Sequence, residues 1–245
     1  MDERVILQIL AEQQEYLERY RKNTWITRQE ESLFEWESNM AQVVIGVRRS
    51  GKSTLCHKVL LQHNIRYAYA DFDDDRFAAL KTSDLNTVLN CLYQLYGTDM
   101  QYIFLDEIQN VEGWHLFVNR LLRQGMYVFL TGSNAKLLSS ELATHLTGRY
   151  NEIRLYPFSY LEYCQSEDIS LHSITTQANA ARKAALTTYL QDGGMPELRN
   201  ITRPQNRRIN VESLVETIVL KDMLRYSNVK QKPFFKHLKN SVAIN

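Results

Sequence analysis

The chain reads Gly46-Val47-Arg48-Arg49-Ser50-Gly51-Lys52-Ser53 over residues 46–53, which matches the Walker A pattern G-x-x-x-x-G-K-S. The apolar β-branched run at residues 43–45 predicts a short buried strand before it, and residues 54–61 predict a helix after it. Glycines let a backbone wrap around phosphate oxygens, and a helix N-terminus directs free N–H groups at them. Because a strand and a helix flank the loop, a phosphate-binding loop is favoured over a chance match in an ordinary turn.

The side chains of this loop have separate expected roles. Lys52 is expected to reach the β- and γ-phosphates of a nucleotide, and the Ser53 hydroxyl is expected to ligate Mg²⁺. The remaining candidates for nucleotide contact are Gly46, Arg48, Arg49, Ser50, Gly51 and Thr54. ATP and Mg²⁺ are therefore the expected ligands.

A second motif lies at residues 102–107, where the apolar run YIFL is followed by Asp106 and Glu107. This is the Walker B pattern, and its apolar part predicts a buried strand. Asp106 then lies at the carboxyl end of that strand, where it is expected to hold Mg²⁺ directly or through water. Glu107 is expected to orient and polarise an attacking water as a general base, the alternative being a surface carboxylate after a strand.

Two further candidates follow a third apolar run at residues 127–130. The polar cluster at residues 131–134, TGSN, resembles the sensor 1 element of AAA+ proteins, so Asn134 is expected beside the γ-phosphate or as the cap of the next helix. Arg149 lies in the turn LTGRY at residues 146–150. An arginine there can neutralise charge on a γ-phosphate, within the chain or across a subunit contact. A surface salt bridge is the equally weighted alternative.

Composition narrows the class of protein. The 245 residues are 44% hydrophobic and 23% charged, as in a globular chain that can bury a core. No apolar run approaches the roughly 20 residues that span a bilayer, so no membrane association is expected. Cys56, Cys91 and Cys164 have neither metal-ligand nor disulfide spacing, which favours a cytoplasmic setting.

Positive charge gathers in two places, although the net charge is only +1. From Arg199 onward ten basic residues stand against three acidic ones. A smaller group comprises Arg19, Arg21, Lys22 and Arg28. Each group indicates a nucleic-acid contact or, with slightly more weight, a solvated helical surface.

Several blocks of sequence together resemble the AAA-type P-loop ATPases of bacteria and archaea that carry a C-terminal DUF4143 domain. The blocks are GVRRSGKSTL (46–55), YADFDDDR (69–76), YIFLDEIQNVEGW (102–114), VFLTGSNAKLLS (128–139), LTGRY (146–150), LYPFSYLEY (155–163), GGMPE (193–197) and KDMLRY (221–226). The last three are not general ATPase features. Members of this family continue into a winged-helix and nuclease-like region, of which this chain is expected to hold only the start.

The predicted fold is α/β: a three-layer P-loop core of the AAA+ type with a parallel sheet in the order 5-1-4-3-2, a helical lid and a helical C-terminal end. The predicted domains are an N-terminal helical segment (1–38), an ATPase core (39–157), a lid (158–200) and the truncated start of a C-terminal domain (201–245).

The predicted function is ATP binding and hydrolysis with Mg²⁺, coupled to a conformational change, with a homo-oligomer as a further expectation. One alternative is a nucleotide-dependent switch or DNA-binding module with little turnover. Another is a phosphotransferase, which the carboxylate of Glu107 directly after Asp106 disfavours.

Overall fold

Five strands form one parallel sheet in the computed structural model, which describes residues 1–21, 24–133 and 145–217. The strands are β1 (Ala41–Gly46), β2 (Tyr67–Asp71), β3 (Tyr102–Asp106), β4 (Tyr127–Ser133) and β5 (Tyr150–Leu155). Their order is β2-β3-β4-β1-β5, and every neighbouring pair is parallel. The predicted order 5-1-4-3-2 is the same order counted from the other edge, so the predicted fold class is confirmed.

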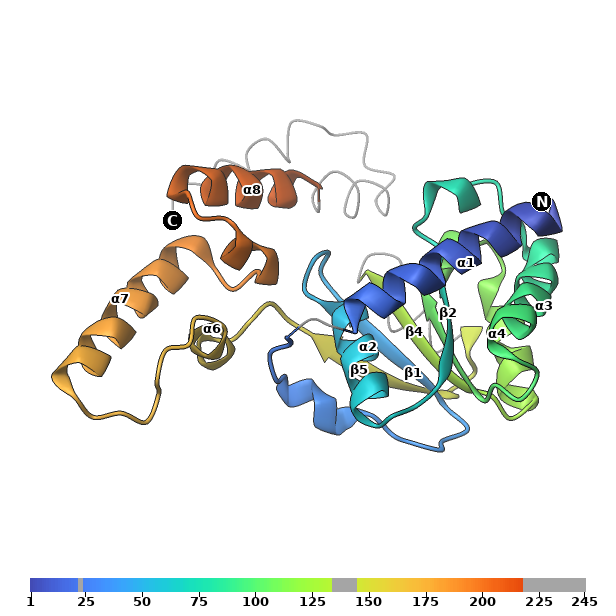
Figure 1. Cartoon of the computed structure of the whole chain (residues 1–245), viewed down its shortest axis with the longest axis horizontal. Helices are drawn as coiled ribbons and strands as arrows, with labels where there is room; N and C mark the ends of the chain where they lie inside the picture. Colours follow the sequence, from blue (N-terminus) through green and yellow to red (C-terminus); the bar gives the residue numbers. More distant parts are fainter. Residues whose placement is uncertain (22–23, 134–144, 218–245) are drawn as a thin grey trace.

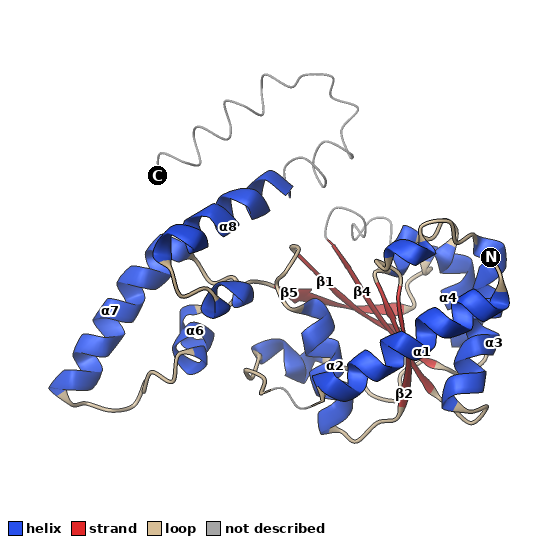
Figure 2. Cartoon of the chain, turned by 45° about the horizontal axis from the view of Figure 1, so that its top comes forward, coloured by secondary structure: helices blue, strands red, loops and turns tan. Residues whose placement is uncertain are grey.

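Helices cover both faces of this sheet, which explains why its interior strands β1, β3 and β4 are largely apolar. Val43 and Ile45 of β1 belong to one buried cluster, together with α1 (Glu3–Tyr20), α3 (Leu85–Tyr96) and α4 (Trp114–Arg123). Val44 points to the other face and packs in a second cluster with α2 (Lys52–Gln62). Figure 2 shows the sheet between these two helical layers.

Helix α1 crosses the edge of the sheet beside β2 (Figures 1 and 2). Ile6, Ile9 and Leu10 belong to the first buried cluster, whereas Leu17 belongs to the second. Between them, the Gln13 side chain accepts from the N–H of Asp71 at 2.9 Å and donates to the C=O of Asp71 at 3.0 Å. An amide side chain thus replaces the missing neighbour strand at this end of β2, and α1 shields an edge that would otherwise be open to pairing.

Three helices extend away from the sheet after β5: α6 (Tyr160–Ser166), α7 (Thr176–Asp192) and α8 (Pro204–Thr217), as Figure 1 shows. The sequence predicts one helical pattern from 159 to 197, but the structure separates α6 and α7 by residues 167–175. Two caps explain the separation, because Ser159 starts α6 and the Thr175 hydroxyl accepts from the N–H of Ala178 to start α7.

The last predicted helix, from about residue 206 to 226, corresponds to α8 up to Thr217, and its remainder lies outside the described residues. Nowhere in residues 1–21, 24–133 and 145–217 is there a helix with the length and apolarity needed to cross a membrane. The bounds of the four domains that the sequence predicts stay predictions.

The Gln13 contact predicts a stability difference. Replacing Gln13 with alanine leaves the N–H and C=O of Asp71 without their side-chain partners, so the free energy of unfolding should fall by about 1–3 kcal/mol in urea titrations. Gln8→Ala is the matched control, because Gln8 lies on the exposed side of the same helix, where its side chain bonds Glu12. Equal unfolding midpoints for the two variants would contradict this role of Gln13.

Buried His57 predicts a pH effect on stability. Burial lowers the pKa of His57 to about 3, and its ring bonds the Tyr67 hydroxyl at 2.9 Å. An unfolded histidine has a pKa of about 6.5, so between these values the unfolded chain binds more protons and acidification destabilises the fold. His57→Gln cannot titrate. Below about pH 6.5 its free energy of unfolding should depend less on pH than the parent's, by up to about 1.4 kcal/mol per unit. Parallel pH profiles for the two proteins would contradict this.

Candidate functional site

The phosphate-loop motif joins β1 to α2 at the carboxyl edge of the sheet. A side chain at Gly46 would place its Cβ 2.2 Å from the carbonyl oxygen of Leu155, so only glycine lets β1 leave the sheet this close to β5. Gly51 has a φ of 94° and caps α2 in a left-handed conformation that glycine adopts at little cost. The backbone therefore turns sharply at both ends of the loop, and the first N–H groups of α2 lie at its mouth.

Lys52 is buried although it carries a charge, with 5% of its surface exposed. Its Nζ donates to the carbonyl oxygen of Val47 at 3.2 Å and lies 3.8 Å from Oε1 of Glu107. The lysine thus spans the loop toward the end of β3. The structure thus brings Lys52 of the Walker A motif close to Glu107 of the Walker B motif.

Asp106 ends β3 and is almost fully buried. Its Oδ1 accepts from the Thr131 hydroxyl, its Oδ2 accepts from the Tyr69 hydroxyl at 3.2 Å, and the Ser53 side chain also hydrogen-bonds it. Burial raises the pKa of Asp106. Burial and the nearby Asp106 charge together raise the pKa of Asp71, at the end of neighbouring β2, to about 7. Negative charge is thus unfavourable at this edge unless a cation compensates it.

Glu107 adopts a left-handed backbone conformation with φ of 52°, which costs a non-glycine residue roughly 1–2 kcal/mol. The Thr131 side chain supports this turn, since its Oγ1 accepts from the N–H of Glu107 at 3.2 Å. The carboxylate is half-buried, and its Oε2 accepts from the side-chain amide of Gln109. The turn therefore directs Glu107 toward Lys52 instead of continuing the strand.

These residues fit a magnesium-nucleotide ligand. Ser53 and Asp106 supply the hydroxyl and carboxylate oxygens that Mg²⁺ prefers, and few protein ligands are needed when phosphates and waters complete the shell. Among the described residues no group of three or more His, Cys, Asp or Glu side chains could form a metal cage. Ser50 is fully buried in the loop, and its Oγ has no hydrogen-bond partner in the described part of the chain. An acceptor-rich ligand would satisfy it.

The other loop candidates contact neighbouring segments. Arg48 lies 3.8 Å from a carboxylate oxygen of Asp73. Arg49 lies 2.9 Å from Oε1 of Glu197, in the short 3₁₀ turn that follows α7. The Thr54 hydroxyl is 2.6 Å from the hydroxyl of Tyr20, at the end of α1. Asn134, the candidate beside the γ-phosphate, lies outside the described residues.

The structure does not bring Arg149 to this site. Arg149 immediately precedes β5, and its carbonyl oxygen accepts from the N–H of Ala41 at the amino end of β1. The phosphate loop begins at the opposite end of β1. Five residues of strand separate the two ends by about 17 Å, which exceeds the reach of an arginine side chain. A role for Arg149 within its own chain is therefore wrong, and a role across a subunit contact stays a prediction.

Arg28 is also misplaced by the sequence interpretation, which assigned it to a solvated or nucleic-acid-facing basic group. Its side chain is 6% exposed and donates to Oε1 of Glu162 at 2.7 Å. Of the group's other members, Arg21 is exposed and pairs with Glu18. Sequence alone gives no signal for the Arg28 contact, because 134 positions separate the partners.

The basic C-terminal stretch is described only as far as residue 217. Within that part, Arg207 pairs with Asp192 and Arg208 pairs with Glu212. The six basic residues from Lys221 onward lie outside the described residues, so nucleic-acid binding by this stretch stays a prediction.

A model of the AAA domain family matches residues 38–164, which hold both motifs and all five strands. An uncharacterized protein of Methanocaldococcus jannaschii is 29% identical over 212 residues, covering 84% of this chain and 47% of that protein. An uncharacterized protein of Haemophilus influenzae is 32% identical over 209 residues, covering 82% of this chain and 50% of that protein. The chain thus spans about half the length of these relatives, and the resemblance to proteins with a DUF4143 domain stays a prediction.

The Thr131 hydroxyl bonds both the carboxylate of Asp106 and the backbone N–H of Glu107, so it should contribute to stability. Thr131→Val keeps the shape of the side chain but leaves the buried Asp106 carboxylate and the Glu107 N–H each short of a partner. The free energy of unfolding should fall by about 1–3 kcal/mol. Thr131→Ser, which keeps the hydroxyl, is the control and should stay closer to the parent in the same urea titration. Indistinguishable valine and serine variants would contradict the assignment.

Proposed function

The chain belongs to the AAA domain family, and on that premise we propose that it binds ATP with Mg²⁺ and hydrolyses it. One observation carries the proposal: Lys52, Asp106 and Glu107 meet at the carboxyl ends of β1 and β3. In open α/β sheets, ligands bind at this edge.

The binding roles follow from the chemistry of the loop. Lys52 contacts the β- and γ-phosphates, and the backbone N–H groups of residues 51–54 hydrogen-bond phosphate oxygens. Ser53 and Asp106 hold Mg²⁺, which when bound neutralises charge on the phosphate oxygens. The buried position of Lys52 supports this assignment, because a desolvated ammonium interacts strongly with an anion placed next to it.

The chemical step is transfer of the γ-phosphoryl group to water. The bond from the γ-phosphorus to the bridging oxygen breaks, and the water oxygen bonds to phosphorus. The proton of that water passes to the carboxylate of Glu107. The turn at Glu107, supported by Thr131, gives this carboxylate a fixed position relative to Lys52. Asn134 is assigned to the γ-phosphate, and Arg149 to the site of a neighbouring subunit in a homo-oligomer.

Coupling to a conformational change is part of the proposal. Arg49 of the phosphate loop pairs with Glu197, which follows α7, so the loop touches the helical segment assigned as the lid. A nucleotide that draws Arg49 toward its phosphates would loosen this contact. The lid at 158–200 and the start of a C-terminal domain at 201–245 are part of the proposal and are drawn from the sequence. A nucleotide-dependent switch with little turnover is the alternative, and the chemistry of Glu107 separates the two.

Glu107→Gln and Lys52→Ala should separate binding from chemistry. Glutamine keeps the shape of Glu107 but accepts no proton, so ATP·Mg²⁺ affinity should stay near the parent's while turnover falls by roughly 10²–10⁴. Lys52→Ala removes a contact made to the bound nucleotide, so affinity itself should fall. Fluorescent-nucleotide titration and phosphate release measure the two quantities.

One control completes this experiment. Gln109→Ala removes the amide that bonds Glu107 but leaves the carboxylate in place, so it should lower turnover far less than Glu107→Gln. A Glu107→Gln protein that hydrolyses ATP at the parent rate would contradict the mechanism and favour the switch.

A further inference from the structure

Arg28 is a buried cation beside the phosphate loop, and its guanidinium contacts three segments: the phosphate loop, the connection after β5, and α6. Its Nε donates to Oε1 of Glu162 in α6 at 2.7 Å, and its Nη2 donates to the carbonyl oxygen of Tyr156 at 2.7 Å. Its Nη1 donates to the carbonyl oxygen of Ser50 at 3.4 Å. The guanidinium also lies 5.0 Å from the ring centre of Phe158. Each of the three guanidinium nitrogens thus donates a hydrogen bond, in directions that the single nitrogen of a lysine could not reproduce.

The contact with Ser50 constrains the phosphate loop directly. A trans peptide is planar, with its C=O and N–H pointing in opposite directions. When Arg28 holds the Ser50 carbonyl, the N–H of Gly51 in the same peptide must point away from Arg28. Gly51 caps α2, and its own carbonyl accepts from the N–H of Leu55 at 2.9 Å. The guanidinium therefore fixes the peptide from which the first turn of α2 begins.

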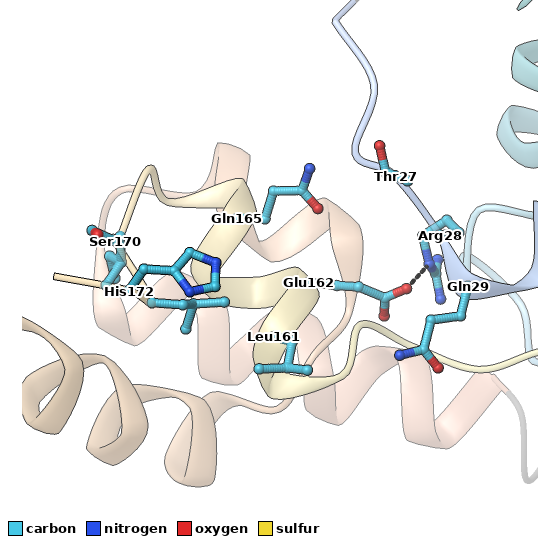
Figure 3. Close-up of a pocket in the computed structure, with 10 residues that line it drawn as sticks. Thr27, Arg28, Gln29, Leu161, Glu162, Gln165, Ser170 and His172 are labelled. Atoms are coloured by element: carbon cyan, nitrogen blue, oxygen red, sulfur yellow. Dashed lines mark hydrogen bonds and ion pairs between the residues drawn. The ribbon is translucent and has the colours of Figure 1, made fainter.

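Glu162 ties this constraint to the helical segment after β5. One carboxylate oxygen takes the Arg28 bond, and the other accepts from the N–H of Ser159 at 2.8 Å and from its hydroxyl. The same carboxylate thus caps α6 and anchors Arg28. Figure 3 shows Arg28 and Glu162 facing each other from the two sides of the contact.

The ion pair between Arg28 and Glu162 lies beside an open space. An open cavity of about 610 Å³ lies between residues 27–29 and α6 with the loop that follows it, and Arg28 and Glu162 both line it. Side chains do not fill the remainder of this interface. A second link, Arg49 to Glu197, is more exposed, with 54% and 28% of the two side chains accessible. Solvent screens such a pair strongly, so Arg28 carries more of the coupling.

We propose that Arg28 is a positioning residue of the phosphate loop: it fixes the Ser50–Gly51 peptide and makes the shape of the loop depend on the docking of α6 through Glu162. The proposal rests on the proposed function for the identity of the ligand, a nucleoside di- or triphosphate. The effect of Arg28 on the shape of the loop does not depend on the proposed function, because this effect exists without nucleotide.

The test compares Arg28→Lys with Glu162→Gln. Lysine can keep the ion pair with Glu162, but its compact ammonium cannot reproduce the planar fork with which Arg28 also reaches Ser50 and Tyr156. Glutamine keeps an oxygen for Arg28, which can still hold the loop. Arg66→Met is the control, because it removes an exposed pair with Asp99 elsewhere on the surface. All three proteins are measured as full chains, by calorimetric titration with ADP and Mg²⁺ and by amide hydrogen exchange without nucleotide.

Arg28→Lys should weaken ADP binding by on the order of tenfold, the scale of a small misplacement of binding groups. It should accelerate exchange of the Leu55 amide at least about threefold, while the Leu105 amide at the centre of β3 stays at the parent rate. Glu162→Gln should show smaller changes in both, and Arg66→Met none.

Unchanged Leu55 exchange in Arg28→Lys would overturn the proposal, and so would equal acceleration at Leu55 and Leu105, which indicates general destabilisation. Leu55 exchange and ADP affinity equal to the parent's in Glu162→Gln would overturn the dependence of the loop on α6, because loss of the Glu162 charge should weaken its hold on Arg28. If the parent binds no ADP, the proposed function fails, while the exchange result still decides the role of Arg28.

Discussion

The parallel direction of all five strands is the constraint on which the site depends. Parallel neighbours need crossover connections, so the segments that leave β1, β3 and β4 all leave from one edge of the sheet. The register aligns Gly46 of β1 with Ser133 of β4, and Asp71 of β2 with Asp106 of β3. The register of the parallel strands is therefore sufficient to bring residues distant in sequence together at this edge. A residue that precedes a strand, such as Arg149, is carried to the other edge by the same rule.

Buried charged side chains surround the phosphate loop. Lys52, Asp106 and Arg28 are each at most 6% exposed, and isolated charges at such positions would be strongly destabilising. Each has defined partners: Val47 and Glu107 for Lys52, hydroxyl donors for Asp106, and three acceptors for Arg28. Breaking one side of a buried pair costs about 3–5 kcal/mol, whereas exposed pairs are worth at most about 1 kcal/mol. The geometry of the phosphate loop is thus set mainly by buried polar contacts on both sides of it.

Local pattern predicts much of this architecture, because apolar runs and glycine spacing are local properties. The runs at 43–45 and 102–105 form β1 and β3, as the sequence predicts. Helix α4 was absent from the sequence interpretation, although its apolar residues Trp114, Phe117, Val118, Leu121 and Leu122 have helical spacing. Arg28 and Thr131 were missed as partners of the site for a different reason. Their importance comes from contacts across the fold, and neither the identity of an arginine nor that of a threonine reveals its partner.

This edge of the sheet is expected to bind a magnesium-nucleotide complex. Calorimetric titration of the parent chain with ADP tests this binding most directly. Parallel titrations in excess Mg²⁺ and in excess chelator separate the contribution of the cation. One nucleotide should bind per chain, with higher affinity in Mg²⁺, because the cation held by Ser53 and Asp106 then compensates the negative charge of the carboxylates and phosphates at this edge. Absence of binding in both conditions, with the chain folded, would contradict it.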